Sequence, residues 1–332
     1  MVLVYLALGV ALFWRVWSSH PTANMQLGGD DWRNVWFMQW TQWALLHGHN
    51  PLYSNAANYP VGVNVLINAG APLLGIVFAP VTLLFGPVAA FNVASTLALP
   101  LSAAAAYALI RRFTRWRPAA FAGGLLYGFG PPLMVHGLEG HLNLAFAPLV
   151  PLIFLVLHEL VVRQQRNPRW WGLLLGLLVV GQFFISTEVL LETVVVGAVA
   201  VAVVAGVGHR QVRARGAAAV KGLAWAGATA AVLLAWPVWV MARGPAHVSG
   251  PVQLVAQAYR ANLVSPFVPD SRQLIVVHGL RSIADRFANT PGENTSYLGI
   301  PLLLLLTAGL IWRRRSATFL RRRHLMLKLI SA

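Results

Sequence analysis

Cysteine is absent from this chain of 332 residues, and carboxylates are scarce. Without cysteine there are neither disulfides nor thiolate metal ligands, so the redox state of the compartment cannot be read from the sequence. Only 9 residues are Asp or Glu, and charged residues make up 10% of the chain. Soluble domains carry about 25%. A water-soluble protein with one core is therefore not expected.

Three nucleotide-binding and catalytic motifs are also missing. The sequence contains no phosphate loop, no dinucleotide-binding glycine fingerprint and no nucleophile elbow. Their absence argues against ATP-driven transport and against the chemistry of soluble nucleotides.

Apolar residues fill most of the chain, which is 58% hydrophobic. They form several runs of about 16 to 24 residues, long enough for membrane-spanning helices. The composition predicts an all-α fold, a polytopic membrane helical bundle in which residues 1–332 form a single integral membrane domain.

The net charge of +16 lies in a few short segments rather than along the whole chain. In a soluble protein this charge would suggest nucleic acid. Short basic loops between apolar runs instead stay cytoplasmic and meet anionic lipid. We therefore expect a multi-pass protein of the plasma (cytoplasmic) membrane with membrane lipids, and no nucleic acid, as partners. Of the 25 Lys and Arg residues, 18 lie in four clusters: 111–117, 163–169, 210–221 and 313–328.

These basic clusters fix a predicted topology of about eight transmembrane helices. Residues 18–87 form a first external loop, and residues 242–296 form another near the C-terminus. The first loop is expected to hold two interfacial helices, 32–46 with its regularly spaced tryptophans and the short apolar segment 72–85. The predicted spans are 2–17, 88–110, 119–135, 143–162, 170–187, 189–207, 222–241 and 297–312.

Under this topology eight of the nine carboxylates lie on the external side, and only Glu159 lies toward the cytoplasm. Acidic residues near a membrane usually mark function. The alternative is that external loops simply need polar residues. We favour a catalytic or ion-binding chamber facing the extracytoplasmic side, because the acids coincide with His, Asn, Trp and Gly.

Asp30 and Asp31, in GGDDW, are the first candidates. Neighbouring carboxylates can share a proton or bind a cation, and either property suits a general base. One aspartate could instead cap the helix that begins at Trp32. A cap needs one carboxylate and does not explain two.

A second group consists of His136, Glu139 and His141, in HGLEGH. Gly137 and Gly140 argue against a helix, so a turn whose side chains converge on a polar substrate is expected. Zinc is disfavoured because the spacing differs from the helical zinc-protease motif. An ordinary polar turn at the membrane interface is the alternative.

Two further acidic sites are candidates for substrate binding. Glu188 and Glu192 lie one helical turn apart at the start of a span, although the position of Glu188 is also explained by favourable interaction with the helix dipole. Glu293 lies in GENTSYLGIP, before the last predicted span.

These motifs occur in an order that resembles the GT-C class, the polyprenyl-phosphate-sugar-dependent membrane glycosyltransferases. In that class one helix precedes a large external loop with an acidic motif and two interfacial helices. GGDDW and APLLGIVFAPVTLLFG match this order, and WFMQW, HGHNPLY, NYPVGVN and ENTSYLG resemble bacterial, mannosyltransferase-like members. The resemblance covers residues 1 to 200 well and the rest loosely. Members are commonly longer, so a fragment or a reduced member is expected.

The resemblance implies an inverting transfer of sugar from a polyprenyl-phosphate donor to an extracytoplasmic glycan, lipid or protein acceptor. Asp30 or Asp31 would be the base, and Arg243 and Arg260 would hold the donor phosphate. His136 and His141 would assist at the phosphate or the acceptor. No metal ligand is assigned, and a requirement for a divalent cation stays open. The rival functions are a transporter or flippase and a non-catalytic membrane subunit.

Overall fold

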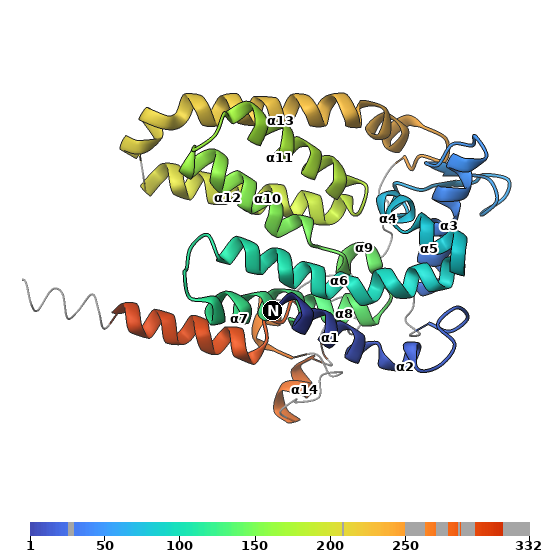
Figure 1. Cartoon of the computed structure of the whole chain (residues 1–332), viewed down its shortest axis with the longest axis horizontal. Helices are drawn as coiled ribbons and strands as arrows, with labels where there is room; N and C mark the ends of the chain where they lie inside the picture. The colour runs from blue at the N-terminus through green and yellow to red at the C-terminus, as the bar shows by residue number, and fades with distance from the viewer. Residues whose placement is uncertain are drawn as a thin grey trace, which may run out of the picture. The chain divides into compact units, whose positions relative to one another are not determined.

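The computed structural model describes residues 1–25, 30–207, 209–249, 263–269, 278–284, 286 and 296–314 (Figure 1). These residues are mostly helical, which confirms the all-α prediction, and the only strands among them form one two-stranded antiparallel sheet. The chain divides into two compact units. The first is Met1–Phe129 with Leu133–Val252, and the second is Gly130–Pro132 with Gln253–Ala332. A single membrane domain stays a prediction.

Most of the described helices belong to the first unit. The second unit contains the 3-10 helix η3 (Ser265–Phe267), α14 (His278–Ala284) and a helix over residues 300–314. The other helices are α1 (Val2–Leu12), α2 (Trp14–Trp17), α3 (Asp31–Leu46), α4 (Pro72–Val77), α5 (Ala79–Phe85), α6 (Pro87–Ile110), α7 (Arg117–Gly128), α8 (Pro131–Leu138), α9 (Leu142–Ala145), α10 (Leu149–His158), the π-helix η1 (Glu159–Arg163), α11 (Pro168–Phe183), α12 (Thr187–Val207) and α13 (His209–Arg243).

Helix α6 lies at the centre of the first unit. In Figure 1 the helices α13, α11, α10 and α6 follow one another across the unit, and α1 and α7 contact α6. Small residues allow these helices to approach closely. A methyl group on Gly9 of α1 would overlap Pro100 of α6, and one on Gly128 of α7 would overlap Ala103. Glycine at these two positions is therefore a packing requirement.

The first predicted external loop is folded and packs on the ends of the long helices. Strands β1 (Tyr53–Ser54) and β2 (Val63–Asn64) form a hairpin, and Asn64 donates to the carbonyls of Val240 and Pro245 at 2.9 and 3.2 Å. The Leu73 amide donates to the Phe184 carbonyl at 3.1 Å. This loop therefore lies where α11 and α13 end.

The two expected interfacial helices differ in outcome. Residues 31–46 form α3 as predicted, and the rings of Trp36, Trp40 and Trp43 follow one another at centroid distances of 5.8 and 5.4 Å. The segment 72–85 is two helices, α4 and α5, which meet at Phe78. Pro80 explains the break, because proline lacks an amide hydrogen and clashes with the preceding turn.

Three segments of the described part are long and apolar enough to cross a membrane: Pro87–Ile110, Leu142–Arg163 and Gly216–Arg243. Membrane association is plausible on this ground, while eight crossings and their orientation stay predictions. The continuous helix predicted over 119–135 is wrong. The chain ends α7 at Gly128 after 12 residues, and a new helix begins at Pro131.

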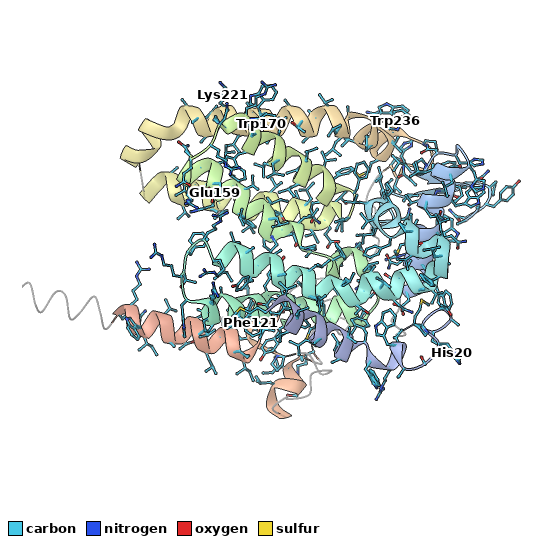
Figure 2. All side chains as sticks on the ribbon, in the orientation of Figure 1. His20, Phe121, Glu159, Trp170, Lys221 and Trp236 are labelled. Atoms are coloured by element: carbon cyan, nitrogen blue, oxygen red, sulfur yellow. The ribbon has the colours of Figure 1, made fainter. Side chains whose placement is uncertain are left out.

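Charge is distributed unequally between the two ends of the first unit. The basic end comprises residues 111–117, 158–171 and 217–225, and the polar end comprises 18–25, 30–73, 136–143, 184–188 and 240–249. Figure 2 shows Glu159, Trp170 and Lys221 toward one end of the helices, and His20 and Trp236 toward the other. All carboxylates described in this unit except Glu159 lie at the polar end or within the first two turns of α12.

Candidate active site

Asp30 occupies the N-cap position of α3, but its side chain does not cap the helix. Its carboxylate pairs with Arg33 in the first turn, and His141 Nε2 lies 3.4 Å from Asp30 Oδ2. The Asp30 side chain is 32% exposed. A carboxylate that is open to solvent and oriented by a guanidinium and an imidazole is suited to accept a proton from a bound hydroxyl.

Asp31, the first residue of α3, is buried, with 1% exposure. A methyl group on Gly140 would overlap its Oδ1 atom, so the turn after α8 packs directly on this carboxylate. Asn34 holds the same turn, because its Nδ2 donates to the Gly140 carbonyl at 2.8 Å and to the Asp30 carbonyl at 3.1 Å. Asp31 thus lies beneath the site, and Asp30 lies at its surface.

The HGLEGH segment is partly helical, contrary to the prediction. His136 and Gly137 belong to α8, and Glu139 and Gly140 form the turn before α9. Gly140 has a φ of +76°, a left-handed conformation that glycine adopts at little cost and that commonly ends a helix. The earlier inference failed because one glycine within a helix costs only about 1 kcal/mol. The predicted turn is therefore limited to residues 139–141.

The turn brings two histidines and a glutamate together. The Nδ1 atoms of His136 and His141 lie 3.2 Å apart in a hydrogen bond, and His141 Nδ1 lies 3.9 Å from Glu139 Oε2. His141 therefore links His136 and Glu139 to Asp30, more than a hundred residues earlier in the chain. The first two groups of predicted site residues lie in one cluster.

His136 lies outside the three membrane-length segments, and its environment keeps it neutral. Burial, and secondarily the positive charge that His141 can carry, lower the pKa of His136 to about 4. Because only one proton can occupy the space between two Nδ1 atoms, a neutral His136 can donate to or accept from His141. His141 is itself buried, at 8% exposure.

The remaining predicted site residues do not join this cluster through any contact described. Glu188 lies in the first turn of α12, where its carboxylate interacts with that of Glu192, and Arg243 is the exposed last residue of α13. Arg260 and Glu293 lie outside the residues that the structure describes.

Two residues of the cluster escaped the sequence analysis, Arg33 and Asn34, and Gly140 was considered only as a turn residue and not for its contact with Asp31. The spacing of Arg33 and Asn34 from Asp30, three and four residues along a helix, was a usable signal. No signal in the sequence indicates the contact of Gly140 with Asp31, because this contact depends on how distant segments pack. Within the described ranges, no group of three His, Asp or Glu side chains has the arrangement of a metal site.

Comparison with known proteins assigns the chain to a family but not to an activity. Residues 2–332 match the family described as Domain of unknown function (DUF6311), so the chain belongs to this family. No curated protein and no solved structure matches it.

Proposed function

We propose that this chain is a GT-C-type membrane glycosyltransferase that moves a sugar from a polyprenyl-phosphate donor to an extracytoplasmic acceptor with inversion. The observation that carries the proposal is the cluster in which Asp30, accessible to solvent, lies 3.4 Å from His141 and pairs with Arg33. It joins the acidic motif of the first loop to the HGLEGH motif, the two segments expected to form the site.

In the proposed reaction Asp30 is the base. Its carboxylate takes the proton of the acceptor hydroxyl as that oxygen attacks the anomeric carbon of the sugar. The bond from this carbon to the phosphate oxygen breaks, and polyprenyl phosphate leaves with the bonding electrons. Attack opposite to the leaving group inverts the anomeric centre. Asp31 is less suited as the base, because a base must reach the proton it removes and Asp31 is buried.

The neighbours of Asp30 have defined roles in this proposal. His141 orients the carboxylate, and His136 in turn holds the His141 ring through the hydrogen bond between their Nδ1 atoms. Among the described residues, Arg33 is the guanidinium that pairs with the base, and it suits the leaving phosphate, since guanidinium binds phosphate with two parallel hydrogen bonds. Arg243 and Arg260 stay candidates for the same phosphate, and Glu139, Glu188 and Glu293 for the acceptor.

The proposal includes a multi-pass topology with the polar end facing outward. Support comes from the separation of charges in the first unit, because short basic segments remain cytoplasmic. Since the chain has no cysteine, single cysteines at Ala56, which is exposed in the hairpin, and at Thr114 report the side of each end directly. Labelling of the first but not the second by an impermeant maleimide in intact cells is expected.

The decisive experiment is transfer in proteoliposomes from radiolabelled polyprenyl-phosphate mannose or arabinose. Loss of a general base typically lowers the rate by about 10²–10⁴-fold, and we expect this for Asp30→Asn. Asp31→Asn is the paired variant, because Asp31 is buried, and loss of transfer in this variant alone would assign the base to Asp31 instead. An Asp30→Asn variant that retains full transfer refutes the assignment of the base. Failure of the wild type to bind either donor favours the transporter or subunit alternative, and addition of a chelator tests the divalent cation.

A further inference from the structure

At the basic end, segments far apart in the sequence form one surface. Glu159 of η1 accepts from Arg163 Nη1 at 3.1 Å, and Arg112, from the segment after α6, lies 3.5 Å from the same oxygen. This carboxylate is 4% exposed, whereas both arginines extend to the surface. One buried anion therefore ties the 111–117 segment to η1.

A second pair of contacts attaches the start of α11 and the middle of α13 to this surface. The Arg169 guanidinium lies 4.7 Å from the centre of the Trp225 ring, and Arg166 lies 5.9 Å from that of Trp171. Gly172 approaches α13 so closely that a methyl group on it would overlap the Gly222 backbone, beside Lys221. Figure 2 shows Lys221, Trp170 and Glu159 at this end of the helices.

Cationic side chains outnumber carboxylates on this surface. Among the described residues of the basic end, Glu159 is the only carboxylate, and two arginines already share it. The exposed cations, which we call the basic patch, are Arg112, Arg115, Arg117, Arg166, Arg169 and Lys221. Such an excess attracts anions in the surrounding medium.

Exposed aromatic rings lie among these cations. Phe113, Trp116 and Trp170 have exposures of 67%, 67% and 68%. Tryptophan is enriched at the headgroup level of a membrane, where its ring is apolar and its N–H is solvated. The basic patch also lies where Pro87–Ile110 and Leu142–Arg163 end and near where Gly216–Arg243 begins. The cations of the basic patch, the exposed aromatic rings and the ends of the membrane-length segments thus lie close together.

We propose that the basic patch selectively binds the headgroups of anionic phospholipids. Phosphate is the partner that guanidinium recognises best, and a lipid places that phosphate at the level of the exposed tryptophans. Nucleic acid would match the charge and can stack on aromatic rings, but it does not account for the adjoining membrane-length apolar segments. The inference is independent of any glycosyl transfer at the polar end.

Quenching of tryptophan fluorescence by brominated lipids tests this inference on the full chain. The protein is reconstituted in phosphatidylcholine vesicles that contain a minor fraction of either brominated phosphatidylglycerol or brominated phosphatidylcholine. We expect stronger quenching by the phosphatidylglycerol, and loss of the difference in Trp116→Phe/Trp170→Phe. Equal quenching of the wild type by the two lipids overturns the proposal.

Variants that lack arginines of the basic patch test which side chains recognise the lipid headgroup. Each cation near an anionic surface contributes about fivefold in affinity, so Arg115→Gln/Arg117→Gln/Arg166→Gln should lower the preference for phosphatidylglycerol on the order of 100-fold. Arg15→Gln is the matched control, since Arg15 is also exposed and lies beside Trp14 in α2, away from the basic end. Equal preference in the triple variant and the control contradicts the assignment.

Two checks keep the result interpretable. Raising the salt concentration should weaken the preference of the unaltered wild type, because the screening length falls from about 10 Å at 0.1 M to about 3 Å at 1 M. This measurement does not depend on the folding of any variant. A single-stranded RNA that displaces the anionic lipid in competition would assign the basic patch to nucleic acid and overturn the inference.

Discussion

The contact of Gly140 with Asp31 is the most specific structural feature of the candidate site, and Gly140→Ala tests it. Two costs are expected. The left-handed backbone at φ +76° costs a non-glycine residue about 1–2 kcal/mol. The new methyl group would also overlap Asp31 Oδ1, and Asp31 has no free path to solvent because it is buried. The turn must therefore move away from α3.

Movement of the turn separates Gly140 from Asn34, whose Nδ2 donates to the Gly140 carbonyl at 2.8 Å. A buried polar group left without its partner costs about 1–3 kcal/mol. The two effects together give a destabilisation of about 2–5 kcal/mol. The readout is the thermal midpoint of the detergent-solubilised chain, which for a chain of this length falls by about 1–2 °C for each kcal/mol.

Gly48 supplies a matched control within the same chain. Its φ is +69°, and a methyl group placed on it meets no atom within 4 Å. Gly48→Ala therefore carries the backbone cost alone, about 1–2 kcal/mol. A second pair, Gly140→Asn and Gly48→Asn, lowers that backbone cost because asparagine tolerates the left-handed region. If Gly140→Ala and Gly48→Ala lower the thermal midpoint equally, the inference that the HGLEGH turn packs on Asp31 is refuted.

Three further predictions concern pH, the hairpin and the basic end. Because the pKa of His136 falls from 6.5 in the unfolded chain to about 4 in the folded one, the unfolded state binds the proton first, and stability should decrease as pH falls from 6.5 to 4. His136→Gln should flatten that part of the pH–stability profile, and an unchanged slope would contradict the burial. Asn64→Ala removes two hydrogen bonds to the end of α13 and should cost about 1–3 kcal/mol, with faster proteolysis of the hairpin as the measurement. Glu159→Ala removes the partner of two partly exposed arginines and should destabilise the chain by about 1–2 kcal/mol, and recovery of the thermal midpoint at high salt would identify charge repulsion as the cause.

Helices with a strong apolar or aromatic pattern were predictable from the sequence. The span from residue 88 to 110 corresponds to α6, and the tryptophan spacing from Trp32 corresponds to α3. Segments with conflicting local signals were less predictable. Pro80 divides 72–85, and the Phe129–Pro131 step divides 119–135, although both segments are apolar throughout. Hydrophobicity shows that a segment is buried or inserted, but it does not report a break within it.

The site was predictable in its parts but not in its assembly. Placing Asp30 and His141 on the same side follows from charge and topology, and the structure brings them to 3.4 Å. Their pairing depends on Asn34, which reaches from α3 to the Gly140 carbonyl, and no periodic pattern encodes that contact. The structure also shows that Asp30 is exposed and Asp31 is buried, a difference that the sequence alone does not reveal for two adjacent aspartates.

The distance between the two ends constrains how a lipid-linked donor reaches Asp30. Helix α6 has 24 residues, and at about 1.5 Å per residue it spans about 36 Å, slightly more than the hydrocarbon core of a membrane. The polar end, which includes Asp30, and the basic patch therefore lie toward opposite leaflets if α6 crosses the membrane. Under the proposed function, a sugar phosphate that reacts at Asp30 must come from the extracytoplasmic leaflet. With Asp30 outward in sealed vesicles, a donor confined to the inner leaflet should stay unreacted until a scramblase is added. Transfer without it would mean that this chain also moves its donor.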